Sequence, residues 1–406
     1  MLDEASSTSA AKVAQDATEF HWGEGKAQPG IGIALSGGGY RAMLFHAGAL
    51  TRMNELGLLS KAQRISSVSG GSIMNGHLAL SWSKLGYADA HGSFAHFKNV
   101  VVDSILAFSR QNILDSSAAP LPGTSVVDQL AKSYDKLLFG GKTLQHIPDS
   151  PCFIFCATNL QTGVLWRFTK PYAGDYVIGR LDKPAIPISH AVAASSAFPP
   201  VLSPFLLELP KGSFTDWPDG PGLPANEIDA FRARVILCDG GVYDNHGMEP
   251  IVKSFLTNFV SDGGLPFART ADVQTDGMGQ LLRVMDVTDN QVRALRRRDL
   301  VQRFIDGSKV KDETKLVAEA RLGAYWGIDT DPRKVNPSNA VPCDFNVTHK
   351  LALVGTGLGD LGETISKQII NWGYAVCDRS LRANYTGHMA TVLPQLPYPE
   401  APLTAL

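Results

Sequence analysis

Residues 31–46 read IGIALSGGGYRAMLFH, and residues 64–72, about thirty residues later, read RISSVSGGS. Each stretch begins with a short strand-like segment, continues through a sharp turn and then starts a helical pattern. Together the two stretches predict two strands joined by a helix. The glycines Gly37, Gly38 and Gly39 allow positive φ angles and leave their backbone N–H groups uncovered by side chains. Because a helix is expected to begin there, those N–H groups favour an anion.

The turn in the second stretch is similar to the nucleophile elbow G-x-S-x-G, in which a serine lies between a strand and a helix. This tight turn needs small residues two positions before and two positions after the nucleophile. Ser69 meets the requirement, with Ser67 in the first glycine position and Gly71 in the second. Ser67 does not, because Ile65 would be its flanking residue. The spacing therefore predicts Ser69 as the nucleophile.

The composition is that of a globular protein with an ample core. Of the 406 residues, 44% are hydrophobic and 19% are charged, and the formal net charge is −2. A general nucleic-acid binder would usually be basic, so this class is disfavoured. The sequence contains no run of about eighteen apolar residues, so we expect no membrane span. The polar start has no signal-peptide pattern, and the five scattered cysteines suit a reducing compartment, so we expect a soluble, cytoplasmic protein.

The rest of the chain alternates between strand and helix patterns, which predicts an α/β fold with a mainly parallel sheet covered on both faces. We expect a flexible leader at residues 1–29, one catalytic domain at 30–390 and a proline-rich tail at 391–406. The expected strands after the first two are 151–157, 164–169, 233–238 and 281–287. The expected later helices are 189–197, 291–305 and 361–383. Residues 211–229 and 261–279 are expected to be loops.

A possible base follows the predicted strand 233–238, where the chain reads Asp239-Gly240-Gly241. Ligands of open α/β sheets bind beyond the carboxyl ends of the strands, so we expect Asp239, Ser69 and the glycine loop at 37–39 to meet there. A serine hydroxyl needs a base to remove its proton, and the tetrahedral intermediate needs N–H donors. The combination predicts acyl transfer.

Four motifs in this order resemble the patatin-like phospholipases. They are GGGYR at 37–41, SVSGG at 67–71, ASSAFP at 194–199 and DGG at 239–241. The resemblance covers about residues 30–250 and is weaker to about 385. It implies a three-layer α/β/α fold and a lipid acyl hydrolase of the phospholipase A or lysophospholipase type. Ser67 departs from the glycine of the family pattern, but serine is small enough for the turn.

The resemblance also implies a role for each motif residue. Ser69 would be the nucleophile and Asp239 the base, and Gly37, Gly38 and Gly39 would form the oxyanion hole. The residues expected to support the site are Arg41, Gly71, Gly240 and Gly241. Such an enzyme needs no metal or other cofactor. Its expected partners are a phospholipid or other acyl-ester lipid and, transiently, a membrane surface.

Several alternatives remain open on the sequence. His246 lies seven residues after Asp239 and could act as the base, although a wall or surface position is favoured. The glycine loop also fits a dinucleotide-binding turn, but no acidic residue ends the second strand, and Glu55 falls in the helix. A third reading is a membrane-degrading effector of the same fold that a signal or partner activates. The arginines between 293 and 303 suit an internally paired or solvated face more than anionic lipid.

Overall fold

The computed structural model describes residues 27–113, 125–210, 212–217, 220, 222–310 and 320–405. The described strands are β1 (Gln28–Leu35), β2 (Ala62–Ser67), β3 (Cys152–Asn159), β4 (Leu165–Phe168), β5 (Tyr172–Asp175), β6 (Gly179–Asp182), β7 (Phe205–Glu208), β8 (Arg234–Asp239), β9 (Phe255–Asp262) and β10 (Leu322–Gly327). The α-helices are α2 (Gly39–Glu55), α3 (Gly70–Ser81), α4 (Asp103–Phe108), α5 (Val126–Tyr134), α6 (Ile188–Ser195), α7 (Ala225–Ala233), α8 (Gly241–Asp244), α9 (Glu249–Val252), α10 (Gly277–Ser308), α11 (Phe345–Ala352) and α12 (Glu363–Asn384).

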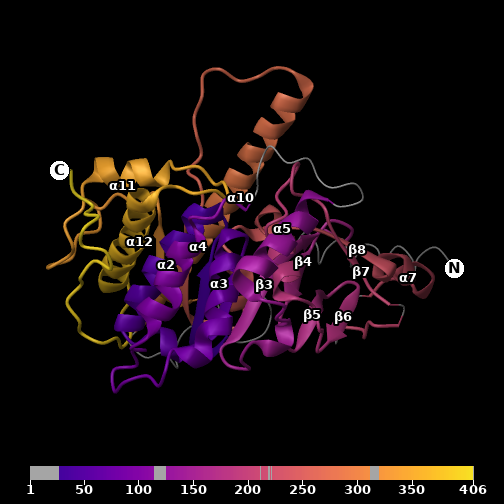
Figure 1. The fold of residues 1–406 in the computed structure, drawn as a ribbon, viewed down its shortest axis with the longest axis horizontal. Helices are drawn as coiled ribbons and strands as arrows, with labels where there is room; N and C mark the ends of the chain where they lie inside the picture. The colour runs from indigo at the N-terminus through magenta and orange to yellow at the C-terminus, as the bar shows by residue number, and fades with distance from the viewer. Residues whose placement is uncertain are drawn as a thin grey trace.

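The described strands form one sheet, which helices flank (Figure 1). Its order is β10-β9-β1-β2-β3-β4-β5-β6, and β8 pairs with both β3 and β7. The five strands from β10 to β3 are all parallel, which confirms the predicted parallel centre. The strands beyond β3 pair antiparallel instead, as their short connections allow.

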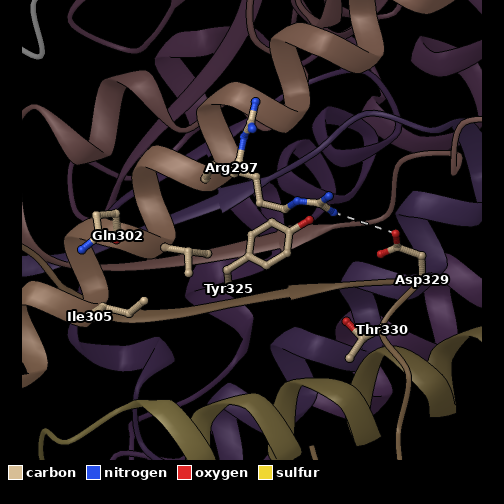
Figure 2. A pocket seen from close by; sticks show the side chains of 8 residues that line it. Arg297, Gln302, Ile305, Tyr325, Asp329 and Thr330 are labelled. Carbon is tan, nitrogen blue, oxygen red and sulfur yellow. Dashed lines mark ion pairs between the residues drawn. The ribbon is translucent and has the colours of Figure 1, made fainter. Parts of the chain in front are cut away.

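Alternate residues of the central strands face two different helical layers, as the period of two in a strand requires. On one face, Ala34 of β1 and Val260 of β9 pack with Ile251 of α9 and Leu300 of α10. The second half of α10 also lies beside β10, and the two elements line an open cavity of about 570 Å³ (Figure 2). Its lining includes Arg297, Arg298, Val301, Ile305, Tyr325 and Asp329.

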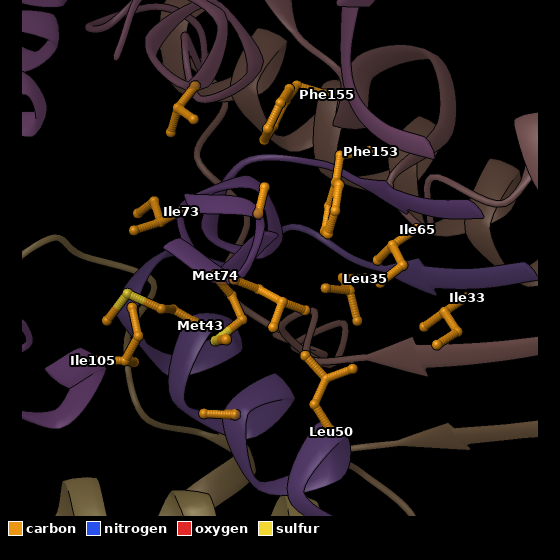
Figure 3. Close-up of a cluster of buried hydrophobic side chains, with 14 of the residues drawn as sticks. Ile33, Leu35, Met43, Leu50, Ile65, Ile73, Met74, Ile105, Phe153 and Phe155 are labelled. Carbon is orange, nitrogen blue, oxygen red and sulfur yellow. The ribbon is translucent and has the colours of Figure 1, made fainter. Parts of the chain in front are cut away.

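The opposite face carries the main core. Ile33 and Leu35 of β1 point to this side, and helices α2 and α3 cover them (Figure 3). Buried side chains that fill the space between the sheet and these helices include Met43, Leu50, Ile73, Met74, Phe153 and Phe155. The chain therefore has the expected α/β/α layers, and both turns of the opening motif begin helices of the same layer.

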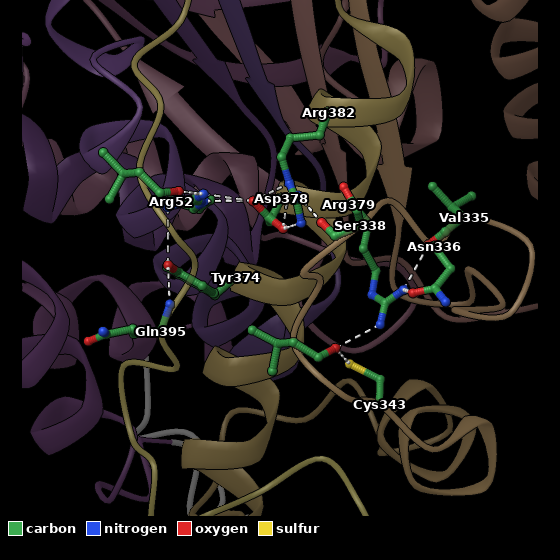
Figure 4. Close-up of polar contacts among 12 residues, drawn as sticks. Arg52, Val335, Asn336, Ser338, Cys343, Tyr374, Asp378, Arg379, Arg382 and Gln395 are labelled. Carbon is green, nitrogen blue, oxygen red and sulfur yellow. Dashed lines mark hydrogen bonds and ion pairs between the residues drawn. The ribbon is translucent and has the colours of Figure 1, made fainter.

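Helix α2 is held in place by α12, which crosses it at very short range. A Cβ added to Gly48 of α2 would lie 1.8 Å from the Ile370 carbonyl oxygen, and one on Gly373 would lie 1.9 Å from the Phe45 carbonyl oxygen. The buried Arg52 of α2 also pairs with Asp378 of α12 at 2.8 Å (Figure 4). Because the glycine loop lies at the start of α2, this packing fixes the loop from behind.

Some predicted elements were wrong. Residues 281–287 were expected to be a strand, but they belong to α10, and their apolar side chains follow a helical spacing. Strands β9 and β10 were not predicted, because polar residues and glycines interrupt their apolar runs. Helix α7 occupies the end of the expected loop at 211–229. Most of the expected leader, residues 1–26, lies outside the described residues.

Candidate active site

Two strands meet nearly end to end beside β3 and bring Ser69 and Asp239 together. One edge of β3 pairs with β4, and the other edge pairs first with β2 along residues 152–155 and then with β8 along residues 157–159. Strand β8 runs antiparallel and so approaches from the far side of the point where β2 ends. Asp239 thus lies at the carboxyl end of its strand, as expected, but it reaches the site from an antiparallel strand.

Ser69 lies in a strained turn between β2 and α3. Its φ angle is 51° and its ψ angle is −119°, which is an unfavourable backbone conformation for a residue with a side chain. The neighbours are glycines because there is no room for a Cβ: one on Gly70 would lie 2.1 Å from the Gly39 carbonyl oxygen, and one on Gly71 would lie 2.4 Å from the Leu35 carbonyl oxygen. The close contacts hold the serine at the tip of the turn.

Asp239 is the last residue of β8 and is almost fully buried. Its backbone is held on both sides, because its N–H donates to the Ala197 carbonyl oxygen at 2.9 Å and the Thr158 hydroxyl donates to its carbonyl oxygen at 2.8 Å. Its carboxylate accepts the Gly241 N–H at 2.6 Å, and the Ser69 side chain is a further hydrogen-bond partner. The two predicted catalytic side chains thus lie beside each other.

Burial decides the ionisation of this carboxyl group. It raises the pKa of Asp239 to about 7, although the hydrogen bonds from Gly241 and Ser69 act to lower the pKa. At neutral pH a large fraction of Asp239 is therefore ionised, yet the group holds a proton more strongly than an ordinary aspartate. A group with a pKa near the working pH can both accept and return a proton.

The glycines of the loop before α2 have different tasks. The Gly37 N–H donates to the Asn245 carbonyl oxygen at 3.0 Å, so it is already used within the protein. In the described residues, the N–H groups of Gly38 and Gly39 meet no acceptor. Gly38 has a φ angle of 141° and Gly39 one of 60°, and a Cβ on Gly39 would lie 1.9 Å from the Thr356 carbonyl oxygen. Only glycine fits these two positions.

Arg41, Gly240 and Gly241, which the sequence predicts to support the site, make close contacts around it. Arg41 is fully buried, and its guanidinium donates to the Gly263 carbonyl oxygen at 2.9 Å and to the Val354 carbonyl oxygen. It therefore ties the glycine loop to the segment after β9. Gly240 is required because a Cβ there would lie 2.4 Å from the Cys156 carbonyl oxygen. A Cβ on Gly241 would lie 2.9 Å from the Asp239 carboxylate.

A chain of buried hydroxyl groups lies beneath the elbow, and it includes Ser195, to which the sequence analysis assigned no role. The Ser69 N–H donates to the Ser195 Oγ at 2.9 Å. That Oγ lies 2.9 Å from the Ser72 Oγ, which in turn lies 2.9 Å from the Ser67 Oγ. The Asn75 amide donates to the Ser67 Oγ at 2.9 Å. The serine that departs from the family glycine is thus part of this chain. The ASSAFP motif was the only sequence signal for Ser195.

His246 pairs with Asp262 and not with Ser69. Its Nε2 lies 3.2 Å from the Asp262 carboxylate, and its ring is buried and packs edge-on against Tyr325. Asp262 also accepts the Tyr325 hydroxyl at 2.7 Å and lies 3.5 Å from Arg293. His246 therefore belongs to a buried ionic cluster behind the glycine loop. Glu55, the acid considered for a dinucleotide, ends α2 and pairs with Arg52 at 2.7 Å.

Comparison with known proteins agrees with this geometry. Residues in a 47-residue stretch are 51% identical to SPO1 of Saccharomyces cerevisiae, which is described only provisionally as a meiotic phospholipase. The stretch is 12% of this chain and 7% of the yeast protein. Human GIVD cytosolic phospholipase A2 has a similar fold, with a TM-score of 0.51 and 13% identity over 93% of this chain and 62% of the human chain. The same human protein with a methyl gamma-linolenyl fluorophosphonate inhibitor and terbium chloride matches with a TM-score of 0.46 and 16% identity over 92% and 61%.

The chain thus spans less than two thirds of the length of either relative. The comparison that decides the family covers the site itself. The family model of the patatin-like phospholipases matches residues 33–252, which include the glycine loop, the elbow and the strand that ends in Asp239. Since this is more than half of the sequence, the chain belongs to the patatin-like phospholipase family.

Proposed function

We propose that this protein hydrolyses carboxylic ester bonds of lipids, with Ser69 as the nucleophile and Asp239 as the base. The observation that carries the proposal is the contact between the Ser69 hydroxyl and a buried carboxyl group whose pKa is raised to about 7. A base with this pKa can take the serine proton at neutral pH. The substrate class follows from the family to which the chain belongs.

The reaction would proceed through an acyl-enzyme. The Ser69 Oγ attacks the ester carbonyl carbon while its proton passes to Asp239, and the oxyanion is held by the N–H groups of Gly38 and Gly39. The Gly70 N–H, directly after the nucleophile, is a further candidate donor. The intermediate collapses when the alcohol leaves with the proton from Asp239. Water then attacks the acyl group, gives its proton to Asp239, and releases the fatty acid as Ser69 regains its proton.

Gly37 takes a different part in this proposal from the one expected. Because its N–H is bonded to Asn245, we assign it to the shape of the turn rather than to the oxyanion. A Cβ on Gly37 would lie 2.5 Å from the Asn245 amide oxygen and 3.3 Å from the Ser69 Cβ. This residue therefore lets the loop approach the nucleophile.

The test compares wild type with Ser69→Ala, Asp239→Asn and the double variant on a medium-chain p-nitrophenyl ester and on phosphatidylcholine. Each single variant should lose at least about 10⁴-fold in kcat/KM, and the double variant should lose no more, because the two residues act as one unit. Labelling of Ser69 by a fluorophosphonate should disappear in Ser69→Ala.

His246→Ala serves as the control, since it removes the rival base. Activity that survives in Asp239→Asn but not in His246→Ala would replace the proposed base with the histidine. A wild type that is silent on all esters and does not react with the fluorophosphonate would favour the effector that awaits a signal.

A further inference from the structure

Residues 263–289, which we call the arm, leave the body of the protein. The arm consists of the loop at 263–276 and the first half of α10, and it projects beyond the rest of the molecule (Figure 1). The second half of α10 is different, because it packs on the body through the buried Leu300 and lines the cavity beside β10 (Figure 2). One continuous helix thus has a packed half and a free half.

The free half exposes an apolar stripe. Met278, Leu281, Leu282 and Met285 are exposed by 65%, 53%, 39% and 36%. They follow the spacing i, i+3, i+4 and i+7, which places them on one face of a helix. Soluble proteins rarely leave a large contiguous apolar patch in water unless it binds something. The stripe is therefore a candidate binding surface.

The arm has its own fixed structure, so the stripe is presented to solvent. The Arg283 guanidinium donates to the Ala268 carbonyl oxygen at 3.0 Å and lies 4.3 Å from the centre of the Phe267 ring. Arg293 donates to the Leu265 carbonyl oxygen at 2.9 Å. The Asp276 carboxylate caps the helix by accepting the Gly279 N–H at 2.6 Å. These contacts hold the loop beside the helix through Arg283 and Arg293.

The base of the arm adjoins the candidate active site. The Gly263 carbonyl oxygen accepts the Arg41 guanidinium, and a Cβ on Gly38 would lie 2.7 Å from the same oxygen. At the other end of the arm, the charge of Asp289 contributes to the raised pKa of Asp239. A surface that the arm binds would therefore be held beside the glycine loop and the Ser69–Asp239 pair.

The charge of the arm indicates which kind of surface the stripe can bind. The arm contains two arginines and four aspartates, a formal charge of −2, so it does not attract an anionic membrane. Two arginines of the packed half, Arg293 and Arg296, face Asp262 and Glu249, as expected for an internally paired face. In the described residues, no helix is long and apolar enough to cross a membrane. The exposed apolar side chains of the stripe are suited to binding at an interface.

We infer that the arm docks the protein on a zwitterionic lipid surface, with the stripe of Met278, Leu281, Leu282 and Met285 in the interface. The inference rests on the proposed function for its choice of occupant, since the substrate of a lipid esterase lies in such a surface. Docking would orient the glycine loop and Ser69 toward the lipid, while α10 would lie in the interface rather than cross it.

The test measures binding to neutral phosphatidylcholine vesicles by flotation, in a Ser69→Ala background so that the lipid is not consumed. Leu281→Gln/Leu282→Gln should lower vesicle partitioning at least about tenfold, because it removes two apolar side chains but keeps the helix propensity. The matched control is Val301→Gln/Ile305→Gln, which changes two exposed apolar residues on the packed half of the same helix and should bind like the parent. Leu281→Trp/Leu282→Trp should bind more tightly, since tryptophan favours the interface.

With an active Ser69, all three double variants should keep the parent kcat/KM on a short, water-soluble ester. Equal partitioning of the parent and the Gln variant would overturn the inference, as would a parent dimer in solution that the Gln variant dissociates, since the stripe would then cover a second copy. Because flotation needs no catalysis, the two proposals can fail separately. Arm-dependent binding by a protein that cleaves no ester would leave the docking intact and reject the proposed function.

Discussion

Two buried aspartates end strands on opposite sides of the glycine loop, and their surroundings give them opposite properties. Asp239 ends β8, and burial raises its pKa to about 7. Asp262 ends β9, and although burial alone would raise its pKa, the charges of Arg293 and His246 hold it well below the usual range. Both carboxyl groups are close to fully buried, so burial does not separate them. The difference lies in the partners: the hydrogen-bond partners of Asp239 are the neutral Gly241 and Ser69, whereas Asp262 faces the cation Arg293.

The comparison indicates which of the two carboxyl groups can exchange a proton near neutral pH. Asp262 is stable as an anion and has no reason to take a proton, so it serves the structure by binding His246, Tyr325 and Arg293. Asp239 is poised to exchange a proton and has the hydroxyl of Ser69 beside it. The glycine loop lies between the two environments, because Gly37 contacts the Ser69 side and Gly38 contacts the segment that follows Asp262.

The largest effect should come from disturbing the glycine loop. Gly39→Ala places a Cβ 1.9 Å from the Thr356 carbonyl oxygen at a φ angle of 60°, and we expect it to lower the free energy of unfolding by at least about 3 kcal/mol and to abolish ester hydrolysis. Gly140→Ala is the matched control, since Gly140 has a φ angle of 57° and nothing within 4 Å of the added Cβ. It should cost only about 1–2 kcal/mol.

Urea unfolding of both variants measures the difference. Equal destabilisation would mean that the backbone angle alone matters and that the loop can move away from Thr356. The separation of the two aspartate environments by a rigid loop would then be wrong.

The next effect compares the aspartates directly. Asp262→Asn should lower the free energy of unfolding at pH 7 by about 3 kcal/mol, because it leaves the partly buried Arg293 with only Asp289 as a charge partner and removes the acceptor of the Tyr325 hydroxyl. Above pH 7, Asp239→Asn should raise the free energy of unfolding by about 1–4 kcal/mol, because the substitution removes the cost of a buried, ionised carboxylate.

The pH dependence gives the sign check for both variants. Asp239 has a raised pKa, so its contribution to stability is present below the unfolded pKa of about 4 and is lost as the pH rises through about 7. Asp262 has a lowered pKa, so its contribution is present above about 4 and is lost as the pH falls further. Denaturant titrations of each variant between pH 2 and 9 measure this. Shifts of the same sign in both variants at pH 8 would contradict the contrast.

Activity should follow the ionisation of Asp239. Below pH 7, kcat/KM should fall about tenfold per pH unit, because the protonated carboxyl cannot accept the serine proton. Asp289→Asn should move the midpoint to lower pH, since the charge of Asp289 raises the pKa of Asp239. A profile measured on a soluble ester, with Asp286→Asn as the control on the same helix, tests both statements. A midpoint near pH 4 in wild type would exclude Asp239 as a desolvated base.

The parts of this site that the sequence could predict are those set by local chemistry. The glycines at 37–39, the small residues around Ser69 and the Asp-Gly-Gly turn are required by backbone geometry within a few residues, so each leaves a readable pattern. The parallel centre of the sheet and its helical layers follow from the alternation of apolar runs. The family resemblance then joined Ser69 to Asp239.

What could not be predicted depends on long-range packing. The direction of β8 is set by its place on the edge of β3 beyond β2, and no local pattern encodes that place. The hydrogen bonds between Gly37 and Asn245 and between His246 and Asp262 join residues that are far apart in the sequence. Residues 281–287 were read as a strand because an apolar run suggests burial, whereas here the run is an exposed stripe on a helix.

The smallest effect should come from the hydroxyl chain, which tests whether the Ser69 side of the site is held as firmly as the Asp262 cluster. Ser195→Ala removes the acceptor of the Ser69 N–H, and an unpartnered N–H costs about 1–3 kcal/mol. Because the elbow is strained, we expect the turn to relax when this hydrogen bond is lost, which would move Ser69. The displaced nucleophile should lower kcat/KM by about tenfold. Ser189→Ala is the control, since Ser189 is a buried serine near the other end of the same helix. A positioning role requires that kcat falls while KM for a soluble ester stays the same; loss of stability with unchanged kcat would make Ser195 a packing residue only.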